Sequence, residues 1–324
     1  MLRICLAAAL ATFFAMPAVH AAKPVQAPVE ALVSPHNRIA VLTVETLEGA
    51  DRIEFNRISS LYGETPESII LRGKPELVSM AEAGEKYLAV YTRSMKDPIT
   101  RDSRMTDPEG PRLVDYYVVR QALFPWSAEL ESLFVRVIKG GKKHYAAELS
   151  EVLAIADSKS PSHQQLGAFE LFMRRDLFNY FTPEQGKTLE RLIDSSGYDE
   201  ESSTLLLRSA ALLREGIVSG WIAEKSRKII DSRGSQYDLA GFTPGLVVAA
   251  ANTLKQFGGP EDFMRLESLM VSNAPGVAKA AMRALLELDT ETAEQMMKKA
   301  LSRKELHRET RRSINHYLNH GVLS

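Results

Sequence analysis

Cysteine is almost absent from this chain, because its single cysteine is Cys5, at the very start of the sequence. A chain body without cysteine forms no internal disulfide bond and has neither a cysteine-rich metal site nor a thiol nucleophile. With 324 residues, the chain can still bury a hydrophobic core large enough to fold without cross-links. The missing cysteines therefore exclude thiol-dependent enzymes and small disulfide-stabilised domains.

A large excess of charge of one sign is also missing. The chain has 40 lysines and arginines against 41 aspartates and glutamates, which gives a formal net charge of −1. Proteins that bind along nucleic acids usually carry a strongly basic domain. The balanced charge argues against bulk nucleic-acid binding.

Local catalytic motifs are missing as well. The sequence contains no Gly-x-Ser-x-Gly, no Ser-x-x-Lys, no glycine-rich phosphate loop and no His-Glu-x-x-His. The paired carboxylates of glycosidases lie far apart in sequence and leave no such motif. A hydrolase built on a distant acid pair therefore stays open as an alternative.

Residues 1–21 have the pattern of a secretory signal peptide. Arg3 supplies a positive charge, residues 6–15 form an apolar run, and small residues at 19–21 precede the expected cut. The apolar run is too short to span a bilayer. We therefore predict export to a Gram-negative periplasm through a cleaved signal that takes Cys5 with it. An uncleaved anchor is the alternative.

Residues 22–37 follow the signal as a predicted linker. The stretch carries three prolines and few large apolar side chains. Such a composition favours an extended or disordered chain. We expect no transmembrane segment in the mature chain, and we expect the first folded domain to begin at residue 38.

Residues 38–140 are predicted to form a β-rich domain. Runs rich in β-branched and aromatic residues alternate with glycine-containing turns. These runs cover 39–44, 53–58, 68–71, 86–92 and 116–119. Their number and length suit a small antiparallel barrel or sandwich. Residues 95–112 are a long polar loop, which is either simply mobile or a lid, and residues 127–139 fit a strand or a helix.

The order of these runs and turns resembles the OB-type barrel of netrin-like and metalloproteinase-inhibitor domains. The resemblance rests on Leu71-Arg72-Gly73 and on the turn and strand at residues 83–88. It implies an OB-like fold for this domain and carries no function with it.

An internal repeat organises the second part of the chain, from residue 141 to residue 324. Pro244-Gly245 recurs as Pro275-Gly276, which is a shift of 31 residues. The apolar positions that follow keep the same shift and the spacing of one helix face. They are Leu246, Ala250, Leu254 and Phe257 in the first copy and Val277, Ala281, Leu285 and Leu288 in the second.

Weaker copies lie upstream, with Leu206, Ala210, Leu213 and Ile217 as one further first-helix stripe. Ser160-Pro161 and Thr182-Pro183 give helix starts in which proline occupies the first turn. Thr182 and Gln185 predict a capping box.

The repeat resembles HEAT-like repeats over residues 145–324, on the strength of the Pro-Gly starts and the paired alanines at 249–250 and 280–281. The resemblance implies an α-helical solenoid. An ordinary irregular helical domain is the alternative. The predicted fold class is thus multidomain, with a small OB-like β-barrel or sandwich followed by a HEAT-like α-helical solenoid.

Basic residues gather near the C-terminus, and we take Arg303, Arg308, Arg311 and Arg312 as candidates for partner binding. Such a cluster could dock an acidic partner or anionic lipid headgroups. Glu305 and Glu309 each lie three residues before an arginine, at a spacing that predicts intrahelical ion pairs. A solvated helix face is therefore the competing interpretation.

Two further groups have the residue types of a metal site. His316 and His320 are four residues apart and share a helix face, with Glu309 as a nearby extra ligand. Residues 194–201 are acidic but lack the EF-hand spacing. We expect unliganded histidines and a plain loop, and we predict neither a metal nor a cofactor.

The two tryptophans, Trp126 and Trp221, lie near the ends of predicted elements. Either could anchor a partner, but aromatic side chains at such places usually fill a gap in the packing. We expect a packing role for both.

These features favour an exported, non-enzymatic binding or scaffold protein that contacts a protein or peptide partner in the cell envelope through its helical-repeat surface. A structural part of a larger envelope assembly is a related interpretation. The alternative from another class is a periplasmic hydrolase without a recognisable local motif.

Overall fold

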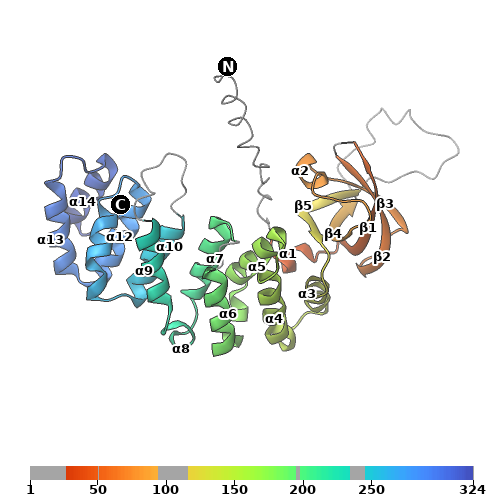
Figure 1. Cartoon of the computed structure of the whole chain (residues 1–324), viewed down its shortest axis with the longest axis horizontal. Helices are drawn as coiled ribbons and strands as arrows, with labels where there is room; N and C mark the ends of the chain where they lie inside the picture. Colours follow the sequence, from red (N-terminus) through yellow and green to blue (C-terminus); the bar gives the residue numbers. More distant parts are fainter. Residues whose placement is uncertain (1–26, 50, 94–115, 195–197, 234–244, 324) are drawn as a thin grey trace, which may run out of the picture.

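The structure, a computed structural model, describes residues 27–49, 51–93, 116–194, 198–233 and 245–323. They form a small closed barrel followed by a curved row of helices, and the barrel and the last helix, α14 (Arg308–His320), lie at opposite ends of the longest axis (Figure 1). The predicted order, a small β-barrel and then helices, is confirmed. The predicted signal peptide, the loop at 95–112 and Pro244 of the first repeat copy lie outside the described residues.

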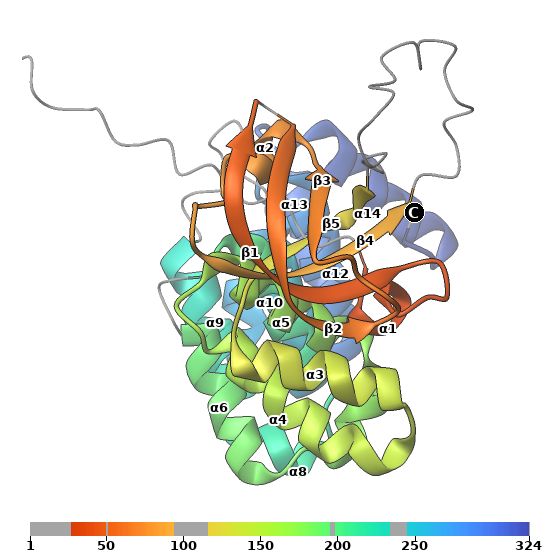
Figure 2. The ribbon, with the colours of Figure 1, turned by 90° about the vertical axis from the view of Figure 1, so that its right-hand side faces the viewer.

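Five strands close the barrel in the order β1-β2-β3-β5-β4, seen from the barrel end in Figure 2. The strands are β1 (Arg38–Glu48), β2 (Arg52–Tyr62), β3 (Ser68–Arg72), β4 (Lys86–Arg93) and β5 (Tyr116–Pro125). Each predicted run is part of a strand. The predicted antiparallel pairing fails at one place, because β3 and β5 pair in parallel. A ring with an odd number of strands cannot alternate direction throughout, so one parallel pair is unavoidable.

Both faces of strand β4 are buried. Tyr87, Ala89 and Tyr91 point into the barrel, whereas Leu88 and Val90 belong to the core that the helices share. Successive side chains of a strand point to opposite faces, so the outer wall of the barrel at β4 is covered by helices. The barrel and the helices therefore share one hydrophobic core on this side.

Strand β5 bends where it meets the helices. Arg120 and Gln121 have φ values of 46° and 62°, and the pairing of β5 with β4 shifts register there. Two consecutive non-glycine residues in the left-handed region cost about 1–3 kcal/mol each. The bend is followed by Ala122 and Phe124, which are buried in the core shared with the helices. We infer that this packing stabilises the strained backbone.

The segment before the barrel is folded. Helix α1 (Val29–Leu32) has both terminal side chains fully buried and contacts α3. The side-chain amide of Asn37 donates to the carbonyl oxygen of Leu32 at 2.8 Å. The prediction of an extended linker over 22–37 is wrong for this part, because burial of two large apolar side chains favours a fixed position.

Helix α3 (Ala128–Lys139) resolves the ambiguous segment at residues 127–139 in favour of a helix. Ser127 caps it by accepting a hydrogen bond from the amide of Leu130 at 3.2 Å. Leu130, Leu133 and Phe134 are fully buried on one face. The helical spacing of these apolar residues outweighs the alternation that also fits a strand.

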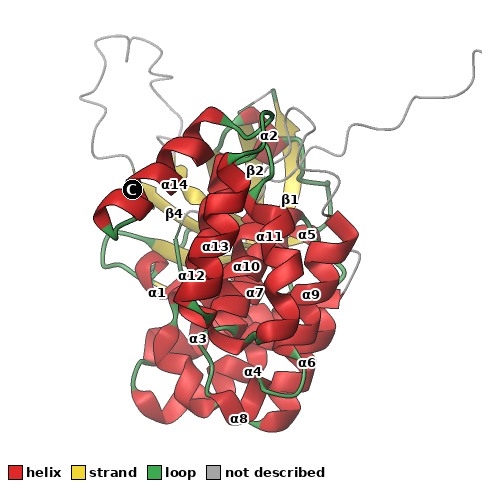
Figure 3. Cartoon of the chain, turned by 90° about the vertical axis from the view of Figure 1, so that its left-hand side faces the viewer, coloured by secondary structure: helices red, strands yellow, loops and turns green. Residues whose placement is uncertain are grey.

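The remaining long helices lie in two layers. The first layer contains α5 (Pro161–Met173), α7 (Glu200–Ala210), α10 (Gly245–Phe257), α12 (Pro275–Leu288) and α14, and each contacts the next. The second layer contains α4 (Tyr145–Ala156), α6 (Pro183–Asp194), α9 (Ile222–Arg233), α11 (Phe263–Met270) and α13 (Thr290–Leu301). Figure 3 views the row from its C-terminal end, with α13 and α14 nearest. Short helices α2 (Pro75–Val78) and α8 (Glu215–Val218) lie in connections.

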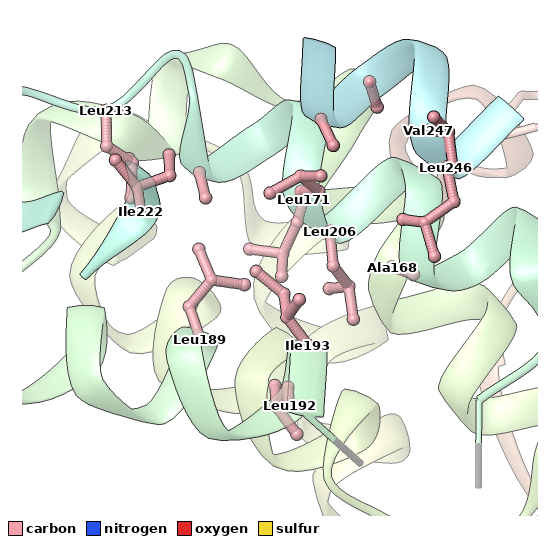
Figure 4. Packing of buried hydrophobic residues seen from close by; sticks show 14 of the residues in the cluster. Ala168, Leu171, Leu189, Leu192, Ile193, Leu206, Leu213, Ile222, Leu246 and Val247 are labelled. Carbon is pink, nitrogen blue, oxygen red and sulfur yellow. The ribbon is translucent and has the colours of Figure 1, made fainter. Parts of the chain in front are cut away.

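The core runs between the layers without interruption. Leu171 of α5, Leu189 of α6, Leu206 of α7 and Leu246 of α10 belong to one cluster and lie within one close-up (Figure 4). Apolar side chains of the long helices in both layers thus belong to one continuous core. No described helix combines the length and the hydropathy needed to cross a membrane.

The two repeat copies found in the sequence are α10 and α12. Their apolar stripes are buried or half-buried throughout. Helices α5, α6 and α12 begin at the predicted prolines. Thr182 and Gln185 form the predicted capping box, with hydrogen bonds of 3.0 and 3.3 Å.

The predicted upstream stripe is wrong as a single helix. Helix α7 ends at Ala210, Leu213 lies in the following turn, and Ile217 belongs to α8. The three side chains still face the core or pack against it. Apolar spacing alone did not reveal that the helix breaks there.

Candidate functional site

The four predicted partner-binding arginines divide into two pairs in the structure. Arg311 uses its guanidinium inside the molecule, donating to the carbonyl oxygens of Leu301 at 2.7 Å and of Arg303 at 2.6 Å. These carbonyls lie at and just after the end of α13, where backbone acceptors have no helical partner. Arg303 in turn lies 3.9 Å from the carboxylate of Glu267. Arg303 and Arg311 therefore hold α13, α14 and α11 together.

Arg308 and Arg312 face solvent on α14. The predicted pair of Glu305 with Arg308 does not form as an intrahelical contact, because α14 begins after Glu305. Among the described residues, neither Arg308 nor Arg312 has an ion-pair partner within 4.0 Å. Their charges are left for solvent or for another molecule.

Ion pairs connect neighbouring helices of the second layer. Asp157, just after α4, pairs with Arg191 of α6 at 2.7 Å, and Asp194 of α6 pairs with Lys225 of α9. The next links are Asp231 with Arg265 at 2.8 Å, and Glu267 with Lys299 at 3.0 Å. The partners in each link lie 31 to 34 residues apart, close to the period of the sequence repeat. Cations on this layer are largely neutralised.

A buried carboxylate lies beside the ion pair of Asp231 with Arg265. Asp262, just before α11, is fully buried and accepts from Arg227 of α9 at 2.8 and 2.9 Å and from the amide of Gly259 at 3.1 Å. Burial alone would raise the pKa of Asp262, but these hydrogen bonds and the charges of Arg227 and Arg265 outweigh it and hold the pKa below its ordinary value.

The outward face of the first layer has a different character. Helices α10 and α12 have nearly the same burial pattern when shifted by 31 residues, so their outward positions correspond. One row of outward positions contains Arg208 of α7, Val248 of α10, Lys279 of α12 and Arg312 of α14. No member of this row is acidic.

A second outward row lies one helical turn further along each helix. Its members are Leu212, just after α7, Asn252 of α10, Arg283 of α12 and His316 of α14. This row also contains no acidic residue. Within the described part of the chain, Arg208, Lys279 and Arg283 have no ion-pair partner within 4.0 Å. We call these two rows the cationic rows.

Carboxylates on the first layer lie beside the cationic rows and are few. Glu200 pairs with Arg233 at 3.3 Å, and Glu287 pairs with Lys255 at 3.5 Å. Glu201 and Glu309 are exposed near the starts of α7 and α14. Negative charge next to a helix start is favourable in itself, so these two residues have a local role.

His316 and His320 lie together on α14 as predicted, with ring centroids 4.8 Å apart. Glu309 lies two turns earlier, at the start of the helix. Among the residues that the structure describes, no group of three or more histidine, cysteine, aspartate and glutamate side chains is close enough to hold a metal ion. Two histidines alone do not complete a metal site.

Helix α5 joins the segment before the barrel to the helices through Glu170. This side chain is fully buried, and its Oε1 accepts a hydrogen bond from the backbone amide of Val29. Its Oε2 is buried without a partner in the described residues. Burial raises the pKa of Glu170 to about 7, against the lowering effects of the Val29 amide and the Arg174 charge.

Arg174, just after α5, lies in a buried charged group beside Glu170. Its Nη2 contacts Glu148 at 2.8 Å and Asp176 at 2.9 Å, and its guanidinium lies 5.4 Å from the ring centre of Tyr145. Only 5 % of the Arg174 side chain and 2 % of the Glu148 side chain are exposed. An ion pair this deep is strong only while both partners are present.

His163 connects the same helix to the barrel. Its Nε2 donates to the carbonyl oxygen of Pro125, the last residue of β5, at 2.6 Å. Burial lowers the pKa of His163, although the hydrogen bond to Pro125 acts in the opposite direction. His163 and Glu170 are seven residues apart and lie on one face of α5. We call the surroundings of these two side chains the α5 junction.

The tryptophans and the acidic loop have intramolecular roles. Trp126 is 38 % exposed, and its indole NH donates to Glu131 at 2.7 Å, while Trp221 donates to the carbonyl oxygen of Ile217 at 3.3 Å. Asp199 caps α7 by accepting from the amide of Ser202 at 2.8 Å. Residues 195–197 of the loop lie outside the described residues.

Sequence reasoning missed both the cationic rows beyond α14 and the α5 junction. The repeat shift of 31 residues, extended from apolar to outward positions, relates Lys279 and Arg283 to Val248 and Asn252. No sequence signal indicates that Glu170 meets Val29, because that contact joins residues 141 positions apart.

The chain matches no protein-family model, no curated protein and no solved structure.

Proposed function

We propose that this protein is an exported, non-enzymatic binding or scaffold protein that contacts a protein or peptide partner through the surface of its helical row. The proposal includes a HEAT-like solenoid for the helices, an OB-like character for the barrel, and removal of residues 1–21 on export to the periplasm. The observation that carries it is the layered packing, in which each first-layer helix contacts the next from α5 to α14. Stacked helix pairs expose long surfaces that suit extended partners.

The uneven distribution of charge supports the same proposal. Ion pairs connect neighbouring second-layer helices, whereas the cations of the cationic rows have no ion-pair partner among the described residues. Unpaired charge on a rigid surface contributes little to folding, because exposed pairs are worth at most about 1 kcal/mol even when they form. Unpaired charge on a rigid surface is typical of a surface that binds another molecule of opposite charge.

The test is cross-linking of the tagged full chain in the envelope of its own cell, followed by identification of the cross-linked proteins. We expect one recurrent, stoichiometric partner and a mature chain that begins near residue 22. A well-folded chain that captures no partner and hydrolyses an envelope polymer would overturn the proposal in favour of the hydrolase alternative. Deletion of the barrel is a poor control here, because its outer wall shares the core of the helices.

A further inference from the structure

We infer that the cationic rows of the first layer bind an extended acidic segment of a protein partner, which runs across α7, α10, α12 and α14. This inference rests on the proposed binding function and assigns a face and a partner chemistry to it. The residues that carry it are Arg208, Lys279, Arg283 and Arg312.

The cationic rows contain no acidic residue. The eight outward positions contain four cations, a histidine, an asparagine and two aliphatic residues. The second layer of the same helices carries at least four links of opposite charge between neighbouring helices. The chain has a net charge of −1, yet among its described residues this face of the first layer carries cations without ion-pair partners. A partner with negative charge meets more attraction there than on the other layer, where most of the described cations already have a carboxylate partner.

The spacing of the cations suits an extended peptide. Packed helices lie roughly 8–10 Å apart, so equivalent positions on α12 and α14 are separated by about that distance. An extended chain in the polyproline II conformation rises about 3.1 Å per residue and repeats its side-chain direction every third residue. Carboxylates at every third residue are therefore spaced by roughly 9 Å along one face of such a segment. This spacing matches a chain that crosses the helices at right angles.

The residues between the cations are uncharged. Leu212 is 46 % exposed, and Val248 and Asn252 lie between the cations of α7 and α12. Aliphatic and amide side chains can contact the backbone and small side chains of a peptide. A nucleic acid would need a denser series of phosphate contacts than these rows offer.

The test measures binding of a labelled peptide that repeats Glu-Pro-Ser, by fluorescence anisotropy on the full mature chain. The test variant carries Lys279→Gln, Arg283→Gln and Arg312→Gln. The matched control carries Lys187→Gln, Lys228→Gln and Lys298→Gln, which removes the same charge from exposed positions of the second layer. All three substitutions in each variant are at exposed or half-exposed positions, so circular dichroism and the Tm should show that both variants fold like the wild type.

We expect the test variant to lose roughly tenfold or more in affinity for the peptide. The control variant should lose less than about threefold, because solvent and salt screen charges that do not contact the peptide. A peptide with glutamine in place of glutamate should not bind. Equal loss in both variants, or equal binding of the glutamine peptide, would overturn the inference. Binding of anionic phospholipid vesicles or duplex DNA to the same rows, with no binding of the peptide, would also overturn it.

Cross-linking of the test variant separates this inference from the proposed function. If the wild type captures a partner and the test variant still captures it, the assignment of binding to the cationic rows is wrong and the proposed binding function stands. If neither captures a partner, the proposed function itself fails.

Discussion

At the scale of single residues, α5 is unusual because two buried titratable side chains connect it to separate parts of the chain. Glu170 binds the backbone of the first segment, and His163 binds the end of the barrel. Their pKa values are shifted in opposite senses from the ordinary values of the free side chains, upward for Glu170 and downward for His163, in both cases chiefly by burial. The α5 junction should therefore respond to pH between about 4.5 and 7.

Glu170→Gln should remove one part of this response. The pKa of Glu170 is about 7 in the folded chain, against an ordinary value of 4.5 in the unfolded chain, so folding favours the protonated form. The contribution of this residue is fully present below about pH 4.5 and is lost as the pH rises through 7, by an amount on the order of 3 kcal/mol. We expect the variant to be more stable than the wild type at pH 8 and to lose this advantage toward pH 5.

The measurement is urea unfolding of both proteins at several pH values. The difference between the two unfolding free energies isolates Glu170, because His163 is present in both and its opposite contribution cancels. His163 favours folding above pH 6.5 and loses that effect as the pH falls below it. A difference that does not change between pH 5 and 8 would contradict the assignment.

Arg174→Met should be strongly destabilising. The substitution leaves Glu148 buried without its cation, and breaking a buried pair in this way costs about 3–5 kcal/mol. The matched control is Arg191→Met, which removes an exposed partner of Asp157 and should cost at most about 1 kcal/mol. Thermal unfolding of both variants at neutral pH is the measurement, and similar losses in the two would argue against a buried pair.

At the scale of elements, close contact between helices depends on particular glycines. A Cβ added at Gly167 of α5 would lie 2.6 Å from the backbone nitrogen of Ala156 at the end of α4. Real Cβ atoms do not approach backbone this closely, so the two helices would have to separate. At Gly276 of α12 an added Cβ would meet nothing within 4 Å.

Gly167→Ala should therefore destabilise the chain and Gly276→Ala should not. Overpacking costs about 1–3 kcal/mol, which exceeds the roughly 1 kcal/mol that alanine contributes to helix formation. At Gly276 the added methyl group meets no neighbour, so only the higher helix propensity of alanine acts. Gly276→Ala should therefore raise the unfolding free energy by about 0.5–1 kcal/mol. Denaturant unfolding of the pair tests this, and equal effects would show that α4 and α5 are not in such close contact.

At the scale of the whole molecule, the barrel and the helices form one core on the side of β4 and β5. Leu88, Val90 and Phe124 of the barrel lie in the same buried cluster as residues of α5 and α7. Domains that share a core unfold together, whereas long repeat arrays can lose cooperativity along their length. The barrel should therefore unfold with the first helices of the row.

The fluorescence of the two tryptophans tests whether the barrel and the helices unfold together. Trp126 lies where the barrel meets α3, and Trp221 lies at the start of α9. We expect Trp126→Phe and Trp221→Phe variants, each with one tryptophan left, to show the same fluorescence midpoint in urea. The transition should also coincide with the loss of helical circular dichroism. A separate, earlier transition of Trp126 would mean that the barrel unfolds alone.

Much of the local structure follows from the sequence alone. The five strand positions, the proline helix starts, the capping box at Thr182 and the buried stripes of α10 and α12 each depend on neighbouring residues. Side-chain period, capping and the fixed φ of proline act over a few residues, so a single sequence contains them. The break after α7 and the helix α1 were missed because packing against distant residues decides them.

Of the candidate site, the sequence alone determined that basic residues gather near the C-terminus, and tertiary structure decided which of them have no partner among the described residues. Arg303 and Arg311 bind groups on neighbouring elements, whereas Arg312 corresponds in position to Lys279 and Arg208 on other helices. The same holds for Glu170, whose pKa depends on burial against Val29. Composition and spacing fix which side chains a helix presents, but only the packing of helices far apart in the chain determines which charges meet a partner within the molecule.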